Sequence, residues 1–122
     1  MAIQSFRELI VWQKSMKLAR DTYTLSRALP SEERFGLASQ IQRSAISIPS
    51  NIAEGSKRST AKDYVQFLRI ANGSAAELET QLLLIRDIYS LEVQEELIQL
   101  DEVQRMLQAL IKSLLQPKTY PL

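Results

Sequence analysis

Apolar side chains recur every three or four residues through most of the chain, the pattern that predicts amphipathic helices. Proline, glycine or clusters of serine and threonine interrupt this pattern at residues 29–31, 55–60 and 89–91. These interruptions leave four segments of helical length. We predict helices over about residues 6–28, 32–54, 60–89 and 92–116.

The second segment carries a regular apolar stripe that passes straight through a proline. Its members are Leu37, Ile41, Ala45, Ile48 and Ile52. Inside a helix, Pro49 removes one backbone hydrogen bond and costs about 3 kcal/mol. Because the stripe keeps its phase on both sides, we predict one helix that is kinked at Pro49 rather than two helices. Gly55 follows at the position of a C-terminal cap.

The third segment has the strongest periodicity in the chain, with apolar residues at helical spacing from Tyr64 to Tyr89. Ser59 or Thr60 serves as its predicted N-cap, and Asp63 stands where a capping box places an acidic residue. The middle of this helix is built of small residues and includes Gly73, which costs about 1 kcal/mol relative to alanine. We expect another backbone to approach closely there.

Four helices joined by short connections predict an all-α fold, an antiparallel up-down four-helix bundle. The chain has 122 residues, a length that suits one domain. Its 3 glycines and 4 prolines provide too few turns for a β-sandwich. We therefore predict a single domain over residues 1–122.

The sequence contains no histidine and no cysteine, which narrows the chemistry sharply. Disulfides, Cys/His zinc sites, histidine bases, cysteine nucleophiles and the Glu-x-x-His di-iron site of ferritin-like bundles are all excluded. Glu77 and Glu79 lie in an apolar stretch, but residues two apart point to different sides of a helix. We expect them to be solvated or paired with basic groups, Glu79 with one on the first or second helix. No catalytic residue, metal site or cofactor is predicted.

Charge is nearly balanced overall and unevenly distributed. The net charge is +1, but residues 1–60 carry 9 basic and 5 acidic side chains, whereas residues 61–122 carry 6 and 9. Such asymmetry is typical of a basic face, or of subunits that meet basic side to acidic side, and it also arises by chance. The longest aliphatic run, residues 82–85, is far too short to span a membrane, and the N-terminus does not resemble a signal peptide. We expect a cytoplasmic protein.

A basic group surrounds the turn between the second and third predicted helices. Lys57, Arg58 and Lys62 lie at this turn, Arg69 follows two helical turns later, and Arg43 lies on the preceding helix. Cations beside a helix N-terminus favour phosphate binding. Charged turns are also often merely solvated, so both interpretations stay open.

Several runs of residues together resemble a known family. They are residues 6–14, 35–37, 42–55 (which end in Ser-Asn-Ile-Ala-Glu-Gly), 67–74 and 77–82. They are similar to the bacterial four-helix bundle proteins encoded in intervening sequences of 23S ribosomal RNA genes. The resemblance implies an antiparallel bundle, a ring-shaped homopentamer and no enzymatic activity. A related branch resembles the accessory proteins of diversity-generating retroelements, whose basic pentamer binds nucleic acid and a partner reverse transcriptase.

A pentamer would account for apolar residues that a lone bundle leaves uncovered. Ile46, Ile98 and Met106 widen the apolar faces of the second and fourth helices, and a neighbouring subunit would cover them.

Within the Ser-Asn-Ile-Ala-Glu-Gly motif we assign structural roles. Pro49, just before it, sets the kink and Gly55 the cap. Asn51 and Glu54 bind turn amides or pair with Arg58.

Two functional hypotheses follow. The first is a non-enzymatic homopentameric ring that binds structured RNA or DNA through Arg43, Lys57, Arg58, Lys62 and Arg69. The second is a scaffold that holds a partner enzyme, such as a reverse transcriptase, without binding nucleic acid itself.

Overall fold

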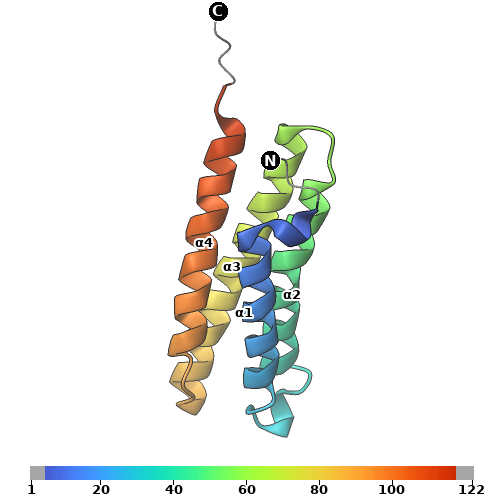
Figure 1. The fold of residues 1–122 in the computed structure, drawn as a ribbon. Coiled ribbons are helices and arrows are strands. Elements are labelled where there is room, and N and C mark those ends of the chain that lie inside the picture. Colours follow the sequence, from blue (N-terminus) through green and yellow to red (C-terminus); the bar gives the residue numbers. More distant parts are fainter. Residues whose placement is uncertain (1–4, 118–122) are drawn as a thin grey trace, which may run out of the picture.

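The computed structural model describes residues 5–117 and shows four long helices, with no strand in that range. The helices are α1 (Ile10–Ser26), α2 (Leu37–Ser56), α3 (Ala61–Tyr89) and α4 (Gln94–Leu115). Successive helices run in opposite directions (Figure 1). Each helix packs against two others, in the cyclic order α1, α2, α3, α4. The predicted all-α, four-helix architecture is confirmed.

Two short 3-10 turns replace the outer parts of the first two predicted helices. The turn η1 (Phe6–Glu8) is capped by Ser5 and separated from α1 by Leu9, whose backbone is extended. The turn η2 (Ser31–Glu33) comes before α2, which begins only after Gly36. The first two helices are therefore shorter than predicted, because amphipathic spacing continues across both breaks and conceals them.

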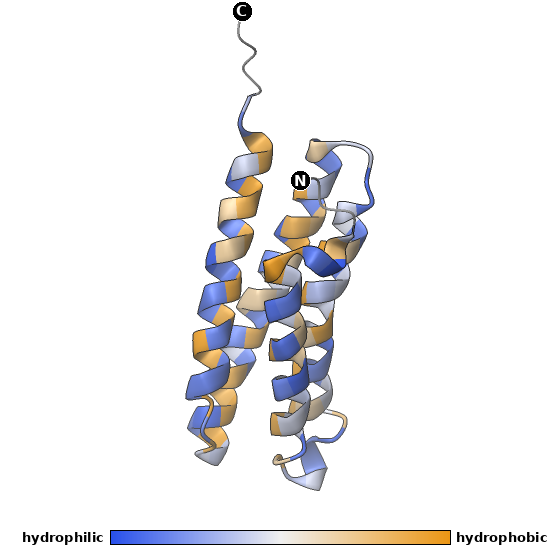
Figure 2. Cartoon of the chain, in the orientation of Figure 1, coloured by the Kyte–Doolittle hydropathy of each residue, from blue (hydrophilic) through white to orange (hydrophobic). Residues whose placement is uncertain are grey.

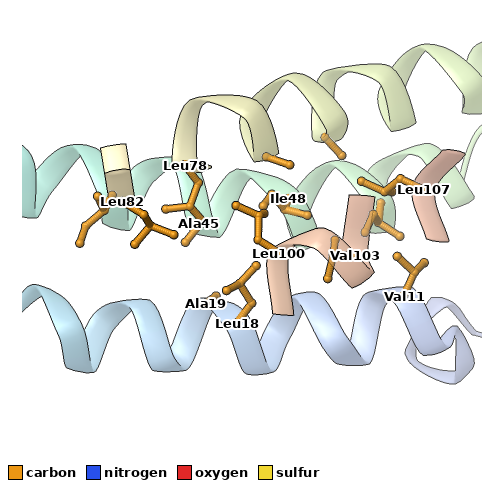
Figure 3. Packing of buried hydrophobic residues seen from close by; sticks show 14 of the residues in the cluster. Val11, Leu18, Ala19, Ala45, Ile48, Leu78, Leu82, Leu100, Val103 and Leu107 are labelled. Carbon is orange, nitrogen blue, oxygen red and sulfur yellow. The ribbon is translucent and has the colours of Figure 1, made fainter. Parts of the chain in front are cut away.

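The core is filled by the apolar stripes of all four helices. Figure 3 shows side chains from every helix meeting along the axis of the bundle, among them Leu18, Ile48, Leu78 and Leu100. Each of these four side chains is buried almost completely. Every helix also carries hydrophilic residues along its length (Figure 2). Burial of these stripes supplies the main driving force for folding.

Pro49 lies inside α2, which continues without a break to Ser56. The prediction of one helix rather than two is therefore confirmed, and the kink angle stays a prediction. Because proline has no N–H, the Ala45 carbonyl receives no helical hydrogen bond from this position. The Pro49 side chain is itself buried, so its apolar contacts offset part of that loss.

Gly55 does not cap α2, contrary to the prediction. It lies within the helix and is buried, and α2 ends at Ser56, with Lys57 as a C-cap of ordinary right-handed geometry. A Cβ atom at this position would lie 2.8 Å from the Cβ of Phe67 and 3.2 Å from the backbone oxygen of Tyr64, both on α3. Gly55 is therefore required for the close packing of α2 on α3.

Gly73, unlike Gly55, has open space around it. A Cβ atom added here would meet nothing within 4 Å, so the close approach expected at the middle of α3 does not occur within the chain. The small residues on either side differ from it, because Ala71, Ser74 and Ala75 are buried against the rest of the bundle. The fold of one chain thus gives no reason for glycine at this exposed position.

Polar side chains join α2 to α3 along the same contact. The Ser44 hydroxyl donates to the Gln81 side-chain oxygen at 2.8 Å, and the hydroxyls of Ser47 and Ser74 are 2.7 Å apart. Asn51 donates to the Ser47 carbonyl oxygen at 2.8 Å rather than binding turn amides, as we had considered. The Ser44–Gln81 and Ser47–Ser74 bonds, which cross between the helices, fix how α2 and α3 are aligned along their length.

Hydrogen bonds of Glu33 connect η2 to α2 and to α3. One carboxylate oxygen accepts the Leu37 N–H at 3.1 Å, and the other accepts the Tyr89 hydroxyl. Both bonds favour the ionised carboxylate, so the Tyr89 hydroxyl first and the Leu37 N–H second hold the pKa of Glu33 below its ordinary value. The carboxylate in turn raises the pKa of Tyr89.

These shifts predict how stability depends on pH. Because the pKa of Glu33 is lower in the folded state, its ionised carboxylate stabilises the fold at pH values above the ordinary glutamate pKa of 4.5. This stabilisation is lost as pH falls through the folded pKa. Because the pKa of Tyr89 is raised in the folded state, its protonated hydroxyl stabilises the fold below the ordinary tyrosine pKa of 10.0. This stabilisation is lost as pH rises through the folded pKa. We expect Tyr89→Phe to lower the free energy of unfolding most near neutral pH, and the difference from the parent protein to narrow below pH 4.5.

Urea unfolding across a pH series measures this difference. Tyr23→Phe, at an exposed tyrosine on α1, is the matched control and should show no such pH dependence. A Tyr89→Phe difference that stays constant down to acidic pH would contradict the assignment.

Candidate nucleic-acid interface

Three of the predicted basic residues gather where α2 ends and α3 begins. Lys57 and Arg58 follow the last residue of α2, and Lys62 lies in the first turn of α3. All three side chains are exposed. We call Lys57, Arg58 and Lys62 the basic turn; Figure 1 shows this connection at one end of the bundle.

Neighbouring side chains hold two members of the basic turn in place. The Arg58 guanidinium lies 4.5 Å from the centre of the Phe67 ring and 3.2 Å from the Glu54 carboxylate, which confirms the expected Glu54–Arg58 pair. The Lys57 ammonium lies 6.0 Å from the centre of the Phe6 ring. Cation–π contacts hold these two charges over the faces of aromatic rings.

The N-terminus of α3 forms with the predicted cap. The Thr60 hydroxyl accepts the Asp63 N–H at 3.1 Å, which settles the choice between Ser59 and Thr60. Asp63 places a carboxylate in the same first turn, where it competes with any bound anion for the helix dipole. With Glu54, two carboxylates oppose the three cations, so the basic turn is only modestly positive.

Arg43 and Arg69 do not join the basic turn. Arg43 lies fourteen residues before Lys57 on α2, about 21 Å away along a helix. It lines a polar groove between α2 and α3 together with Gln40, Ser47 and Glu77. Arg69 lines a separate groove between α3 and α4. The five candidate residues therefore occupy three places on the surface.

Charge is instead divided between the two ends of the bundle. Lys112, in the last turn of α4, belongs to the end that holds the basic turn, because α4 runs antiparallel to α3. The opposite end carries six carboxylates at the helix ends and connections, against three arginines. The carboxylates are Glu32, Glu33, Asp87, Glu92, Glu95 and Glu96, and the arginines are Arg27, Arg34 and Arg86. Lys112 is not among the predicted site residues, although the predicted antiparallel bundle already implies its place at this end.

Comparison with known proteins identifies the family. The pattern that describes 23S rRNA-intervening sequence proteins matches residues 7–109 of the chain. The chain belongs to this family. None of the curated proteins matches it.

One solved structure supports the assignment to the 23S rRNA-intervening sequence proteins. It is a protein of unknown function from the S23 ribosomal protein family of Bacteroides thetaiotaomicron, 28% identical in sequence, with a TM-score of 0.76. The match covers 84% of this chain and 96% of the other. The match to the 23S rRNA-intervening sequence family includes all five candidate residues, from Arg43 to Arg69, and ends before Lys112.

The acidic side chains of this 23S rRNA-intervening sequence protein do not gather into a metal-binding group in the part of the chain that the structure describes. Within residues 5–117, no group of three or more acidic side chains is placed to hold a metal ion. Glu77 and Glu79 point into different surroundings, as expected. Glu79 accepts a hydrogen bond from Gln104 on α4 at 3.2 Å, which corrects the pairing expected with the first or second helix. None of the helices in the described range is long and apolar enough to cross a membrane.

An apolar groove between α1 and α2 was also missed by sequence reasoning. Its volume is about 640 Å³, and we call it the α1–α2 groove. Its apolar lining is Phe6, Trp12, Met16, Ala19, Tyr23, Ile46, Pro49 and Ala53. Of these residues, Ile46 was predicted to be apolar surface that a lone bundle leaves uncovered. Only the relative placement of two helices turns these residues into one surface.

Proposed function

We propose that this protein is a non-enzymatic helical bundle that assembles into a homopentameric ring and binds structured nucleic acid in the cytoplasm. The basic turn carries the proposal. Three exposed cations surround the N-terminus of a 29-residue helix, and Lys112 adds charge at the same end. Lysine and arginine contacts to phosphate supply most of the affinity of such interfaces.

Repetition in a ring compensates for the modest charge of one copy. Each basic turn is opposed by Glu54 and Asp63, so a single subunit would bind weakly. Five copies in one ring would act together, since linked weak sites gain affinity through high effective concentration. Arg43 and Arg69 would then contact nucleic acid only where it extends away from the end of the bundle.

A titration at several salt concentrations tests the proposal. The purified protein is added to a labelled structured RNA and to a matched DNA duplex, and is compared with the triple variant Lys57→Gln, Arg58→Gln, Lys62→Gln. Binding that weakens steeply with salt is expected. For each subunit that contacts the nucleic acid, the triple variant should reduce the slope of log K against log salt by about 2.7, the value for three lost phosphate contacts.

A matched control removes the same charge elsewhere. Arg34→Gln, Arg86→Gln and Arg105→Gln change three exposed arginines outside the basic turn. This control should leave the salt slope nearly unchanged. Equal losses in the two triple variants would mean that overall charge, not the basic turn, governs binding, and no binding at low salt would refute the proposal.

The alternative is a scaffold for a partner enzyme. The exposed apolar lining of the α1–α2 groove favours this function, because uncovered apolar surface is typical of protein interfaces. Absence of nucleic-acid binding even at low salt, combined with a stable assembly, is the result that the scaffold function predicts.

A further inference from the structure

The α1–α2 groove has a length and an apolar lining suited to binding a helix. It extends along α1 from Trp12 to Arg27, fifteen residues or about 22 Å. Two large apolar residues in it, Tyr23 and Ile46, are 39% and 43% exposed. Grooves of this kind bind the apolar face of an amphipathic helix.

The rim of the α1–α2 groove is basic. Arg20 and Arg27 line it from α1, and within the described residues neither forms an ion pair. No carboxylate is among the lining residues. The complementary helix should therefore carry an acidic group between its apolar side chains.

One exposed face of α3 has these properties. Ile70, Leu84 and Ile88 are 52%, 44% and 59% exposed, and Glu77 lies midway between the first two, seven residues from each. Gly73 lies on the same face with open space in front of it. We call Ile70, Gly73, Glu77, Leu84 and Ile88 the α3 stripe; it extends over eighteen residues, or about 27 Å.

We propose that the α1–α2 groove of one copy receives the α3 stripe of a second copy. The two surfaces match in length, and Glu77, which has no ion pair within the described residues, would face Arg20 near the middle of the groove. Gly73 then has a reason to be glycine, because it lets the groove approach the α3 backbone. The inference rests on the self-association in the proposed function and names the surfaces that make it.

This pairing gives a head-to-tail assembly. The α3 stripe lies on the exposed surface of α3, where Glu77 borders the polar groove between α2 and α3, whereas the α1–α2 groove lies between α2 and α1. Each copy therefore offers one surface and receives the other, and such contacts close into rings or continue as filaments. The outer face of α4 competes poorly, because Ile98 is its one large exposed apolar residue between the helix ends and stands beside Glu95, Asp101 and Glu102.

Lysine substitutions at exposed positions test the two surfaces without disturbing the core. Ile46→Lys in the groove and Leu84→Lys in the stripe should each weaken association at least about tenfold, as expected for a charge placed in an apolar interface. Ile98→Lys makes the same change outside both surfaces and should leave association unchanged. Light scattering after size exclusion measures the mass, and circular dichroism confirms that each variant is folded.

A charge swap tests the central pair. Arg20→Glu and Glu77→Arg should each lower the oligomer fraction, and the double variant should restore it. Restoration is the result that a merely structural role for either residue does not predict.

Cross-linking tests the pairing directly, since the natural chain has no cysteine. Ser50→Cys lies in the groove, and Thr80→Cys lies on α3 beside the stripe, both exposed. A bis-maleimide should cross-link a mixture of the two single variants and leave either variant alone uncross-linked.

The outcomes separate this inference from the proposed function. An oligomeric protein that is indifferent to Ile46→Lys and Leu84→Lys would overturn the pairing and leave the ring standing. A monomeric parent protein at all accessible concentrations would overturn both the pairing and the ring. Loss of nucleic-acid binding alone bears only on the basic turn.

Discussion

Replacing Gly55 by alanine should destabilise the bundle by about 2–3 kcal/mol, within the range for overpacking a filled core. The added Cβ would lie 2.8 Å from the Phe67 Cβ and 3.2 Å from the Tyr64 carbonyl oxygen. Neither atom is the far end of a flexible side chain, so α2 and α3 would have to separate. Alanine recovers about 1 kcal/mol of helix propensity, which is too little to offset the clash.

Gly73→Ala is the matched control for this substitution. It makes the same change in the interior of a helix, but nothing lies within 4 Å of the added atom. We expect it to stabilise the isolated chain by about 0.5–1 kcal/mol. Urea unfolding followed by circular dichroism, at concentrations low enough to keep the protein monomeric, measures both. The same sign of change for both variants would refute the close packing at Gly55.

The contrast between these glycines shows where sequence reasoning succeeds and where it fails for this fold. A glycine after a helical stripe usually caps the helix, and so Gly55 was interpreted as a cap. The atoms that decide its role belong to α3, on the far side of a turn. Gly73 was expected to allow close packing, yet its surroundings within the chain are open. Local spacing predicts that a helix exists, but not which surface will face its glycines.

Helix boundaries, likewise, were predicted only where the residues that set them are close together in the sequence. The start of α3 was predicted to within a residue because a residue next to it in the sequence, Thr60, caps it. The breaks at Leu9 and Gly36 escaped notice because apolar spacing continues through them. At Gly36 the backbone adopts φ −110° and ψ −117°, and the Glu33 carboxylate bridges the break to the N–H of Leu37. No periodic pattern encodes that contact.

For the candidate site too, only contacts between residues close in the sequence could be predicted. Lys57, Arg58 and Lys62 are close in the chain, so their proximity in space could be predicted. Arg43 and Arg69 lie in separate grooves because the phase of each helix turns them to other sides of the bundle. The α1–α2 groove needs the placement of two helices, which spacing along one of them cannot supply.

Burial rather than residue type should decide the effect of leucine substitutions on α3. Leu78 is fully buried and belongs to the core cluster to which all four helices contribute (Figure 3). Leu78→Ala should lower the free energy of unfolding by about 3 kcal/mol, the sum of lost apolar burial and the cavity left behind. The neighbouring core positions of α3, Ala71 and Ala75, are already small, so they cannot fill that cavity.

Leu84→Ala removes the same atoms from the same helix at a position that is 44% exposed. In the monomeric protein it should cost no more than about 0.5 kcal/mol, as is usual at the surface. At concentrations where copies associate, Leu84→Ala should also weaken the assembly, whereas Leu78→Ala acts on the fold of each chain. Urea unfolding below and above the association range separates the two effects. If Leu84→Ala leaves the concentration dependence of unfolding unchanged, the α3 stripe does not contribute to the contact between copies.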